Sequence, residues 1–245
     1  MFTQNIKPRG RGRPPGRTEQ GAATRQRLYE VAIALIGERG YEATTLRDIA
    51  ERADVSAGLL YRYFPSKRAI VLALYDELSR DYAERVVGMS PGRWRDRFVF
   101  ALETSLGVLG PHRTMLAALV PVLVAGPEEG LFANATAFSR VRVERAFLDA
   151  VAGATDAPQT SLAVATGRVL YLVHLGVVLW WLLDRSPGQR ATTALVSLLR
   201  QMLPSVALTL RFPAVRRFVR TAAELSREAL ADDIEDPGLG SAIRN

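Results

Sequence analysis

The 245-residue chain contains no cysteine and only two histidines. The absence of cysteine excludes disulfide bonds, zinc sites with cysteine ligands and thiol nucleophiles, and it fits a reducing compartment such as the cytoplasm. The histidines, His112 and His174, lie far apart in sequence and lack the spacing of a metal-binding motif such as H-E-x-x-H. We therefore expect no metal site, and we interpret His174, in an apolar helix, as a core or pocket residue.

Signatures of catalysis and of cofactor binding are also missing. The sequence has no G-x-S-x-G motif, and the glycines between residues 10 and 16 alternate with arginine instead of linking a strand to a helix. We expect neither an enzyme nor a bound cofactor.

Long hydrophobic runs are absent as well. The segments 169–183 and 115–126 are apolar, but both are shorter than the roughly 20 residues that a membrane span requires. A helix that is apolar on all sides is otherwise one that is buried in a core or a subunit interface. The N-terminal segment has no apolar h-region, so we expect no secretory signal peptide. These features predict a cytoplasmic protein without membrane contact.

The positive charge is concentrated at one end of the chain. Residues 1–68 hold thirteen Lys and Arg against seven Asp and Glu, whereas the remaining residues hold nineteen against eighteen. This asymmetry is typical of a module that binds a polyanion, joined to a nearly neutral body. A merely solvated basic surface is the alternative.

Residues 44–67 carry the pattern of two short helices separated by a turn. Thr45 is a favourable N-cap, and Asp48 lies in the first turn, where a carboxylate stabilises free amides. Ser56 offers a second N-cap so soon afterwards that the chain must turn at residues 53–55. Leu60 and Phe64 continue the buried face. The pattern indicates a helix-turn-helix, whose second helix can enter a DNA major groove.

The rest of the chain predicts an all-α fold. Residues 1–21 are rich in Gly, Pro and Arg and should form a disordered basic arm, after which Thr24 caps a helix that ends before Gly40. We expect a three-helix DNA-binding domain over 22–82, a helical effector-binding and dimerisation domain over 85–230, and an acidic flexible tail over 231–245. Gly and Pro clusters mark the helix breaks in the second domain.

Three motifs together point to a family: E-R-G-Y at residues 38–41, T-x-R-x-I-A at 45–50, and A-x-V-S-x-G-x-L-Y-x-Y-F-x-S-K at 53–67. They resemble the N-terminal domain of the tetracycline-repressor (TetR) family, over about a quarter of the chain. One departure is Asp54, where the family usually has glycine in the turn. Asp tolerates the left-handed region, so we expect the turn to survive.

The resemblance implies which residues contact DNA. Arg47 could make a bidentate contact to guanine, and Leu59 could touch a thymine methyl group. Tyr61, Tyr63 and Lys67 are expected to bind phosphates, although the two tyrosines could instead pack beside the core. The complete implied set is Thr45, Arg47, Ser56, Ala57, Gly58, Leu59, Tyr61, Arg62, Tyr63 and Lys67.

The basic arm resembles an AT-hook core. Arginines separated by glycine fit a narrow A·T-rich minor groove, where the potential is most negative. The arginines concerned are Arg9, Arg11, Arg13 and Arg17. A solubilising basic tail is the alternative.

The resemblance further implies a ligand-responsive regulator; a repressor is the family's commoner role, and an activator is the alternative. The apolar helices expected at 162–183 and 192–210 are similar to those with which the family builds a four-helix dimer interface. A dimer with two-fold symmetry requires a palindromic operator of double-stranded DNA. A small, mostly apolar effector is expected between the helices; Trp94, Trp180 and Trp181 either line that cavity or belong to the core. Two other interpretations remain: a nucleoid-type protein that binds DNA through the arm without sequence preference, and a membrane-associated or enzymatic helical protein.

Overall fold

A computed structural model describes residues 16–126 and 128–230, and all regular secondary structure in these ranges is helical. The predicted all-α fold is confirmed. The chain divides into two compact units, one up to Ile70 and one from Val71 onward. The division falls inside helix α4 (Lys67–Val86), earlier than the expected boundary at 82–85. Because α4 runs unbroken through it, no linker marks this division in the sequence.

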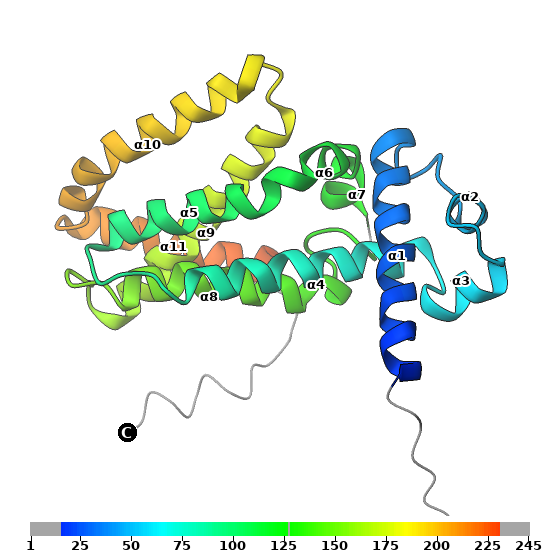
Figure 1. Cartoon of the computed structure of the whole chain (residues 1–245). Coiled ribbons are helices and arrows are strands. Elements are labelled where there is room, and N and C mark those ends of the chain that lie inside the picture. The colour runs from blue at the N-terminus through cyan, green and yellow to red at the C-terminus, as the bar shows by residue number, and fades with distance from the viewer. Residues whose placement is uncertain (1–15, 127, 231–245) are drawn as a thin grey trace, which may run out of the picture. The chain divides into compact units, whose positions relative to one another are not determined.

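The first unit consists of α1 (Gly16–Arg39), α2 (Leu46–Arg52), α3 (Ala57–Tyr63) and the first residues of α4 (Figure 1). The apolar stripe of α1 packs against α2, and α2 packs against α3. This arrangement gives the two short helices the neighbour they need to bury a core. The side chains that form this core are Leu28, Ala32, Leu35, Ile36, Ile49, Leu60 and Phe64, each at most 1% exposed.

Helix α1 begins earlier than the sequence analysis predicts. The prediction of disorder up to residue 21 is wrong for residues 16–21, which form the first turns of α1. Thr24 is therefore not an N-cap. It is a residue within α1, and its hydroxyl donates to the carbonyl of Gln20, one turn earlier, at 2.8 Å. Glu19 in the first turn favours this earlier start, because a carboxylate stabilises a helix N-terminus. At the other end, α1 stops as predicted, since Gly40 adopts a φ of 86°.

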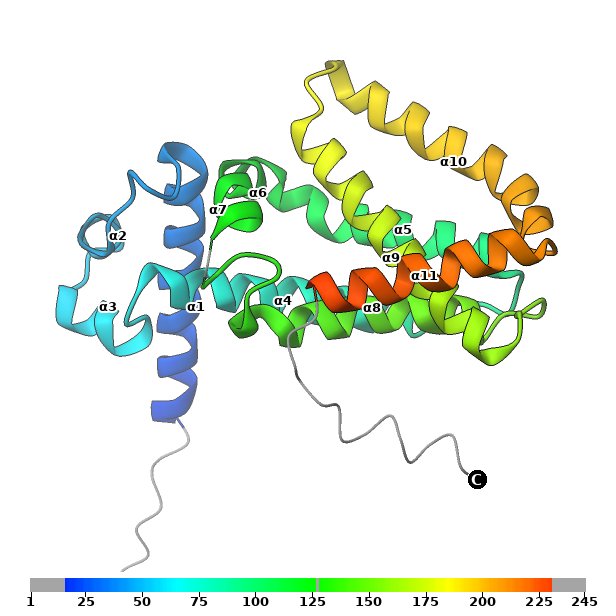
Figure 2. The ribbon, with the colours of Figure 1, turned by 180° about the vertical axis from the view of Figure 1, so that it is seen from behind.

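The second unit contains the rest of α4 and seven further α-helices among its described residues (Figures 1 and 2). Helices α5, α8 and α9 pack against one another, and α11 lies along α9. Phe98 and Phe147 are fully buried between them, with ring centroids 5.9 Å apart. The bounds are α5 (Trp94–Leu109), α6 (Arg113–Ala118), α7 (Val120–Ala125), α8 (Ala137–Ala152), α9 (Thr160–Leu183), α10 (Arg190–Thr209) and α11 (Pro213–Leu230).

The predicted Gly and Pro breaks separate these helices, with one difference. The apolar run 115–126, interpreted as a single buried helix, forms the two short helices α6 and α7. Pro121 explains the interruption, because proline lacks an amide hydrogen and fits only the first turn of a helix.

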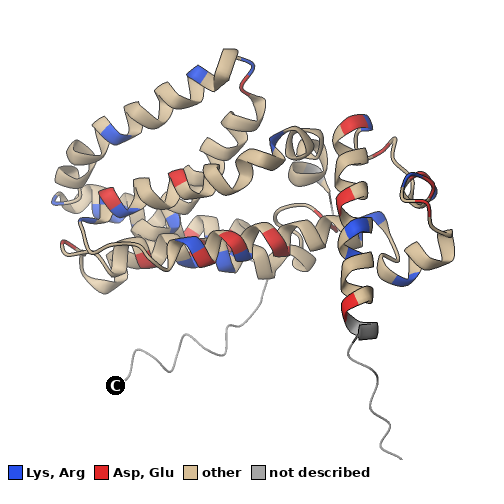
Figure 3. Cartoon of the chain, in the orientation of Figure 1, with Lys and Arg blue, Asp and Glu red and all other residues tan. Residues whose placement is uncertain are grey.

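Among the described residues, two helices are long and apolar enough to cross a membrane by composition, but they differ in burial. In α9 half of the apolar window is buried inside the unit, as expected of a core helix. In the segment 187–209, which contains α10, only 11% is buried. Both views place α10 at the edge of the unit, and Figure 3 shows few charges along it, Arg190 and Arg200 being its charged residues. Helix α10 thus leaves an apolar face uncovered.

Candidate DNA interface and ligand cavity

The N-terminus of α2 is closed by a reciprocal cap. The amide of Asp48 donates to the Thr45 hydroxyl at 3.1 Å, while the Thr45 amide and hydroxyl donate to the Asp48 carboxylate at 2.9 and 2.7 Å. The hydrogen bond from the Thr45 side chain is the largest cause that lowers the pKa of Asp48 from its usual 3.8. The cap fixes the start of α2 and leaves the neighbouring Arg47 exposed.

The turn between α2 and α3 forms as the sequence predicts. Asp54 adopts a φ of 50°, in the left-handed region that asparagine and aspartate tolerate. Ser56 caps α3 by accepting a hydrogen bond from the amide of Leu59 at 3.2 Å. The guanidinium of Arg27 on α1 donates to the carbonyl of Ala53, which ties the turn to the supporting helix.

Helix α3 buries Leu60 and turns most of its other side chains outward. Tyr61 is 53% exposed, and Ala57, Gly58 and Arg62 are exposed beside it. The remaining two candidate residues of the helix, Leu59 and Tyr63, are half-buried.

Gly58 has no role in folding that the structure reveals. A Cβ placed on it would meet nothing within 4 Å, and its φ lies outside the positive region. A glycine inside a helix costs about 1 kcal/mol relative to alanine. The fold would therefore be more stable with a side chain here, and the missing side chain leaves room for another molecule to approach the helix closely.

Lys67 makes contacts that sequence reasoning missed. Its ammonium donates to the carbonyls of Tyr41 and Glu42 at 2.7 and 3.5 Å and lies 4.4 Å from the centre of the Tyr41 ring. Two of its three N–H groups are thus used inside the first unit, which leaves one for a phosphate. No local pattern signals this link, because the two residues are 26 positions apart.

The arm lies mostly beyond the described residues. Arg9, Arg11 and Arg13 fall outside them, and of Arg17 only the backbone is described, as part of α1.

The second unit holds an apolar cavity of about 370 Å³. Its walls are formed by residues of α4 to α9 and of the segment between α7 and α8, so a molecule inside it would touch α4 directly. None of the three tryptophans lines it: Trp94 and Trp181 are buried at 3% and 4% exposure, and Trp180 is 51% exposed. Trp181 lines the second hollow described below. The apolar lining includes Leu78, Val108, Leu109, Leu116, Leu123, Val143, Leu175, Val178, Leu179 and Leu182.

His174 and Ser105 form a polar pair in this wall. The Ser105 hydroxyl lies 2.8 Å from Nε2 of His174, and both side chains are almost completely buried. The imidazole packs on Phe147, with centroids 4.7 Å apart. Burial lowers the pKa of His174 to about 3, so the ring is neutral at physiological pH. This location agrees with its interpretation as a core or pocket residue.

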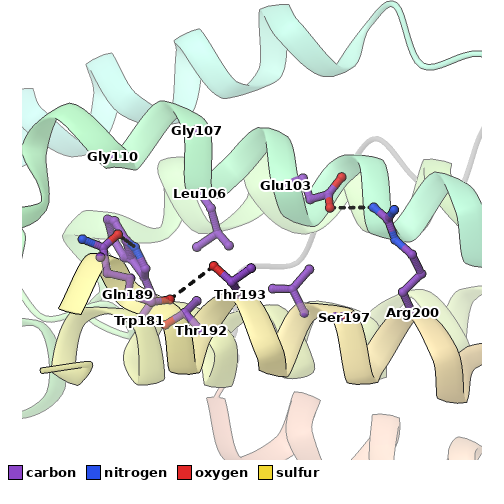
Figure 4. Close-up of a pocket in the computed structure, with 12 residues that line it drawn as sticks. Glu103, Leu106, Gly107, Gly110, Trp181, Gln189, Thr192, Thr193, Ser197 and Arg200 are labelled. Carbon is purple, nitrogen blue, oxygen red and sulfur yellow. Dashed lines mark hydrogen bonds and ion pairs between the residues drawn. The ribbon is translucent and has the colours of Figure 1, made fainter. Parts of the chain in front are cut away.

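A second hollow, of about 480 Å³, lies between α5 and α10 (Figure 4). Glu103 and Arg200 form an ion pair across it at 2.6 Å, and Trp181 donates to the side chain of Gln189 at 3.3 Å. Because polar and charged side chains make up much of this wall, the apolar cavity is the better candidate for an apolar ligand.

Helix α4 is tied to the rest of the second unit at the cavity wall. Arg142 on α8 donates from Nη1 to the Asp76 carboxylate at 3.0 Å and to the Ser79 hydroxyl at 2.6 Å. Tyr75 donates to the carbonyl of Glu129 at 3.0 Å. Ser79 and Tyr75 both line the cavity. Nothing in the sequence signals these contacts, since each joins segments more than 50 residues apart.

Comparisons with known proteins agree with this geometry. The family model described as "Bacterial regulatory proteins, tetR family" matches residues 28–74. The transcriptional repressor KstR of Rhodococcus jostii (strain RHA1) is 34% identical over 170 residues, covering 66% of this chain and 74% of that repressor. The chain belongs to the TetR family.

Two further transcriptional regulators extend the likeness over most of the chain. The transcriptional regulator EthR of Mycolicibacterium smegmatis is 28% identical over 218 residues, covering 85% of this chain and 96% of that regulator. A crystal structure of a tetR-family regulator from Streptomyces coelicolor superposes with a TM-score of 0.57 at 22% identity, covering 91% of this chain and 95% of that one.

This TetR-family chain is a DNA-binding helix-turn-helix transcriptional regulator, and it is not an enzyme. The resemblance read from the three sequence motifs is confirmed.

Proposed function

We propose that the chain represses transcription as a homodimer that reads a palindromic operator with the exposed face of α3. Gly58 carries this proposal, because a helix-destabilising glycine with open space around it has its best use where a DNA surface approaches. In this proposal Ala57, Leu59 and Arg62 read bases, with Arg47 beside them. Thr45, Ser56, Tyr61, Tyr63 and the free N–H of Lys67 position the helix on the backbone.

Dimerisation through α9 and α10 is part of the same proposal. Helix α10 leaves Leu198 and Met202 about half exposed, at 51% and 53%, and Val206 and Leu208 are exposed further along. An apolar helix face of this kind, with few charges along it, is typical of a subunit interface. A two-fold axis between two such faces would present two copies of α3 to half-sites about one helical turn apart.

The apolar cavity is proposed as the effector site. An apolar ligand there would touch Tyr75, Leu78, Ser79 and Tyr82 on α4. It would thus act on the helix that Arg142 holds in place, and α4 continues into the first unit as one unbroken helix. A ligand that favours another position of α4 would move the two copies of α3 away from their half-sites and release the DNA.

Because the proposed operator is chromosomal DNA, we place the protein in the cytoplasm, at the nucleoid, with no membrane contact. The arm with Arg9, Arg11, Arg13 and Arg17 would add minor-groove contacts beside the half-sites.

Transcript measurements test repression. Genomic fragments bound by the purified protein are first identified by sequencing, and transcripts of the adjoining genes are then compared with and without the chain. Higher transcript levels in its absence support the proposal. Lower or unchanged levels at all bound sites would refute repression.

A further inference from the structure

Most polar side chains in the wall of the apolar cavity are hydrogen-bonded within the protein. Tyr75 donates to Glu129, Ser79 accepts from Arg142, and Ser139 donates to the carbonyl of Thr136 at 2.8 Å. Arg140 donates to the carbonyl of Leu131 at 3.1 Å. These groups are satisfied without a ligand, so they give the cavity little specificity.

Three polar groups in the same wall remain incompletely satisfied. Within the described part of the chain, Nδ1 of His174 and the hydroxyl of Tyr82 have no hydrogen-bond partner, although both atoms are buried. Ser105 uses its hydroxyl for one bond, to Nε2 of His174, and a hydroxyl can make more than one. Buried polar groups without partners are costly and therefore uncommon, and a ligand oxygen is one way to satisfy them.

Two of these groups, His174 and Tyr82, pack on one side chain, Phe147. The rings of His174 and Tyr82 pack on it with centroid distances of 4.7 and 6.4 Å. Burial keeps both groups uncharged, because it lowers the pKa of His174 and raises that of Tyr82. Arg140 is the charged residue of the described cavity wall, and its guanidinium donates to the carbonyls of Leu131 and Ala133 at 3.1 and 3.5 Å.

We propose that the Ser105–His174 pair selects ligands that carry one uncharged carbonyl or hydroxyl oxygen on an otherwise apolar body. This inference rests on the proposed role of the cavity as the effector site. Ser105 or the imidazole can donate to a carbonyl, and the imidazole can also accept from a hydroxyl, since its tautomer adapts to the bond that Ser105 makes. A carboxylate would lose its hydration in this cavity, and the guanidinium of Arg140 is already bonded to two backbone carbonyls.

Displacement of a neutral fluorescent probe tests the proposal. N-phenyl-1-naphthylamine is bound to the full-length protein at neutral pH and displaced by cyclododecane, cyclododecanone, cyclododecanol or dodecanoate. We expect Ser105→Ala and His174→Phe to weaken binding of the ketone and the alcohol about three- to tenfold, the worth of one hydrogen bond, and to leave the hydrocarbon unchanged. Ser139→Ala is the matched control, because it removes a wall hydroxyl that is already bonded to Thr136.

The outcomes separate this inference from the proposed function. If probe and hydrocarbon bind but neither variant changes the ratio of ketone to hydrocarbon affinity, the selection by Ser105 and His174 is refuted while the cavity remains a ligand site. Tighter binding of dodecanoate than of the ketone refutes it as well. If no compound binds, the effector site itself is refuted and this inference with it. Circular dichroism of each variant identifies any that fail to fold, and Ser105→Thr, which keeps a hydroxyl, should retain the preference for the ketone.

Discussion

The ammonium of Lys67 joins the start of α4 to the loop that follows α1. It donates to the Tyr41 carbonyl at 2.7 Å and lies over the Tyr41 ring. The bond holds the loop that leads into α2, one residue after Gly40 ends α1. A residue expected to bind phosphate thus also stabilises the DNA-binding unit.

Replacing Lys67 with methionine should lower the free energy of unfolding of the first unit by about 1 kcal/mol, since a charge-assisted hydrogen bond is lost. Arg62→Met, which removes an exposed cation, should leave stability unchanged. Urea denaturation measures both. If Lys67 also binds a phosphate, its loss reduces the slope of log affinity against log salt by about one. An unchanged slope would restrict Lys67 to the structural role.

Gly58→Ala should separate folding from DNA binding. The fold should become more stable by about 1 kcal/mol, because alanine is the better helix former and its Cβ meets nothing. Operator affinity should fall by about tenfold or more, since one lost close contact costs about 1–3 kcal/mol. Gly107→Ala in α5, where a Cβ also has open space, is the control and should keep full affinity. Equal affinity for Gly58→Ala and wild type would contradict a close approach at this position.

Thr45→Ala should destabilise the first unit by about 1 kcal/mol through loss of the N-cap. It should also change the dependence of stability on pH. The folded pKa of Asp48 lies below its usual 3.8, so its contribution is present above that value and is lost as the pH falls through the folded pKa. Urea midpoints measured from neutral pH down to about pH 3 should therefore fall less steeply in Thr45→Ala than in wild type. Parallel curves would contradict this linkage.

Met202→Arg should convert the dimer to a monomer. Met202 is 53% exposed on α10, and an arginine there would place a charge in the proposed apolar interface. Sedimentation analysis should show half the mass, and operator binding should weaken together with dimerisation. Glu84→Arg, at an exposed position of α4, changes charge elsewhere and should sediment like wild type. A Met202→Arg protein that remains dimeric would exclude this face.

Removing residues 1–15 leaves α1 intact and tests the basic arm. Operator affinity should fall, and its salt dependence should become less steep, because fewer cations displace counterions from the DNA. A truncated protein with the same affinity and the same salt slope would show that the arm only adds solubility.

The sequence predicts the DNA-binding unit well because its signals are local. Thr45, Ser56 and Asp54 lie within the short segment whose caps and turn they determine, and the family motifs span the same residues. The start of α1 was missed, since the glycines at 16 and 21 lower the helix propensity there and the carboxylate of Glu19 in the first turn is a weak signal.

The ligand cavity could not be predicted in the same way. Its wall combines side chains from six helices and one connecting segment, and pairs such as Ser105 and His174 are 69 residues apart. The three tryptophans seemed plausible lining residues by composition, yet the wall is formed mainly by leucine and valine. Whether two residues so far apart in sequence are buried together depends on tertiary packing, and the periodicity of a single helix does not encode it.

The central claim is a dimer that reads DNA through two copies of α3. Selection of bound sequences from a random duplex library by the purified full-length protein tests it most directly. We expect the selected sequences to be enriched in an inverted repeat whose half-sites are separated by about one helical turn. For Met202→Arg we expect this enrichment to be lost. Enrichment of A·T-rich DNA without an inverted repeat, or no enrichment at all, would contradict it.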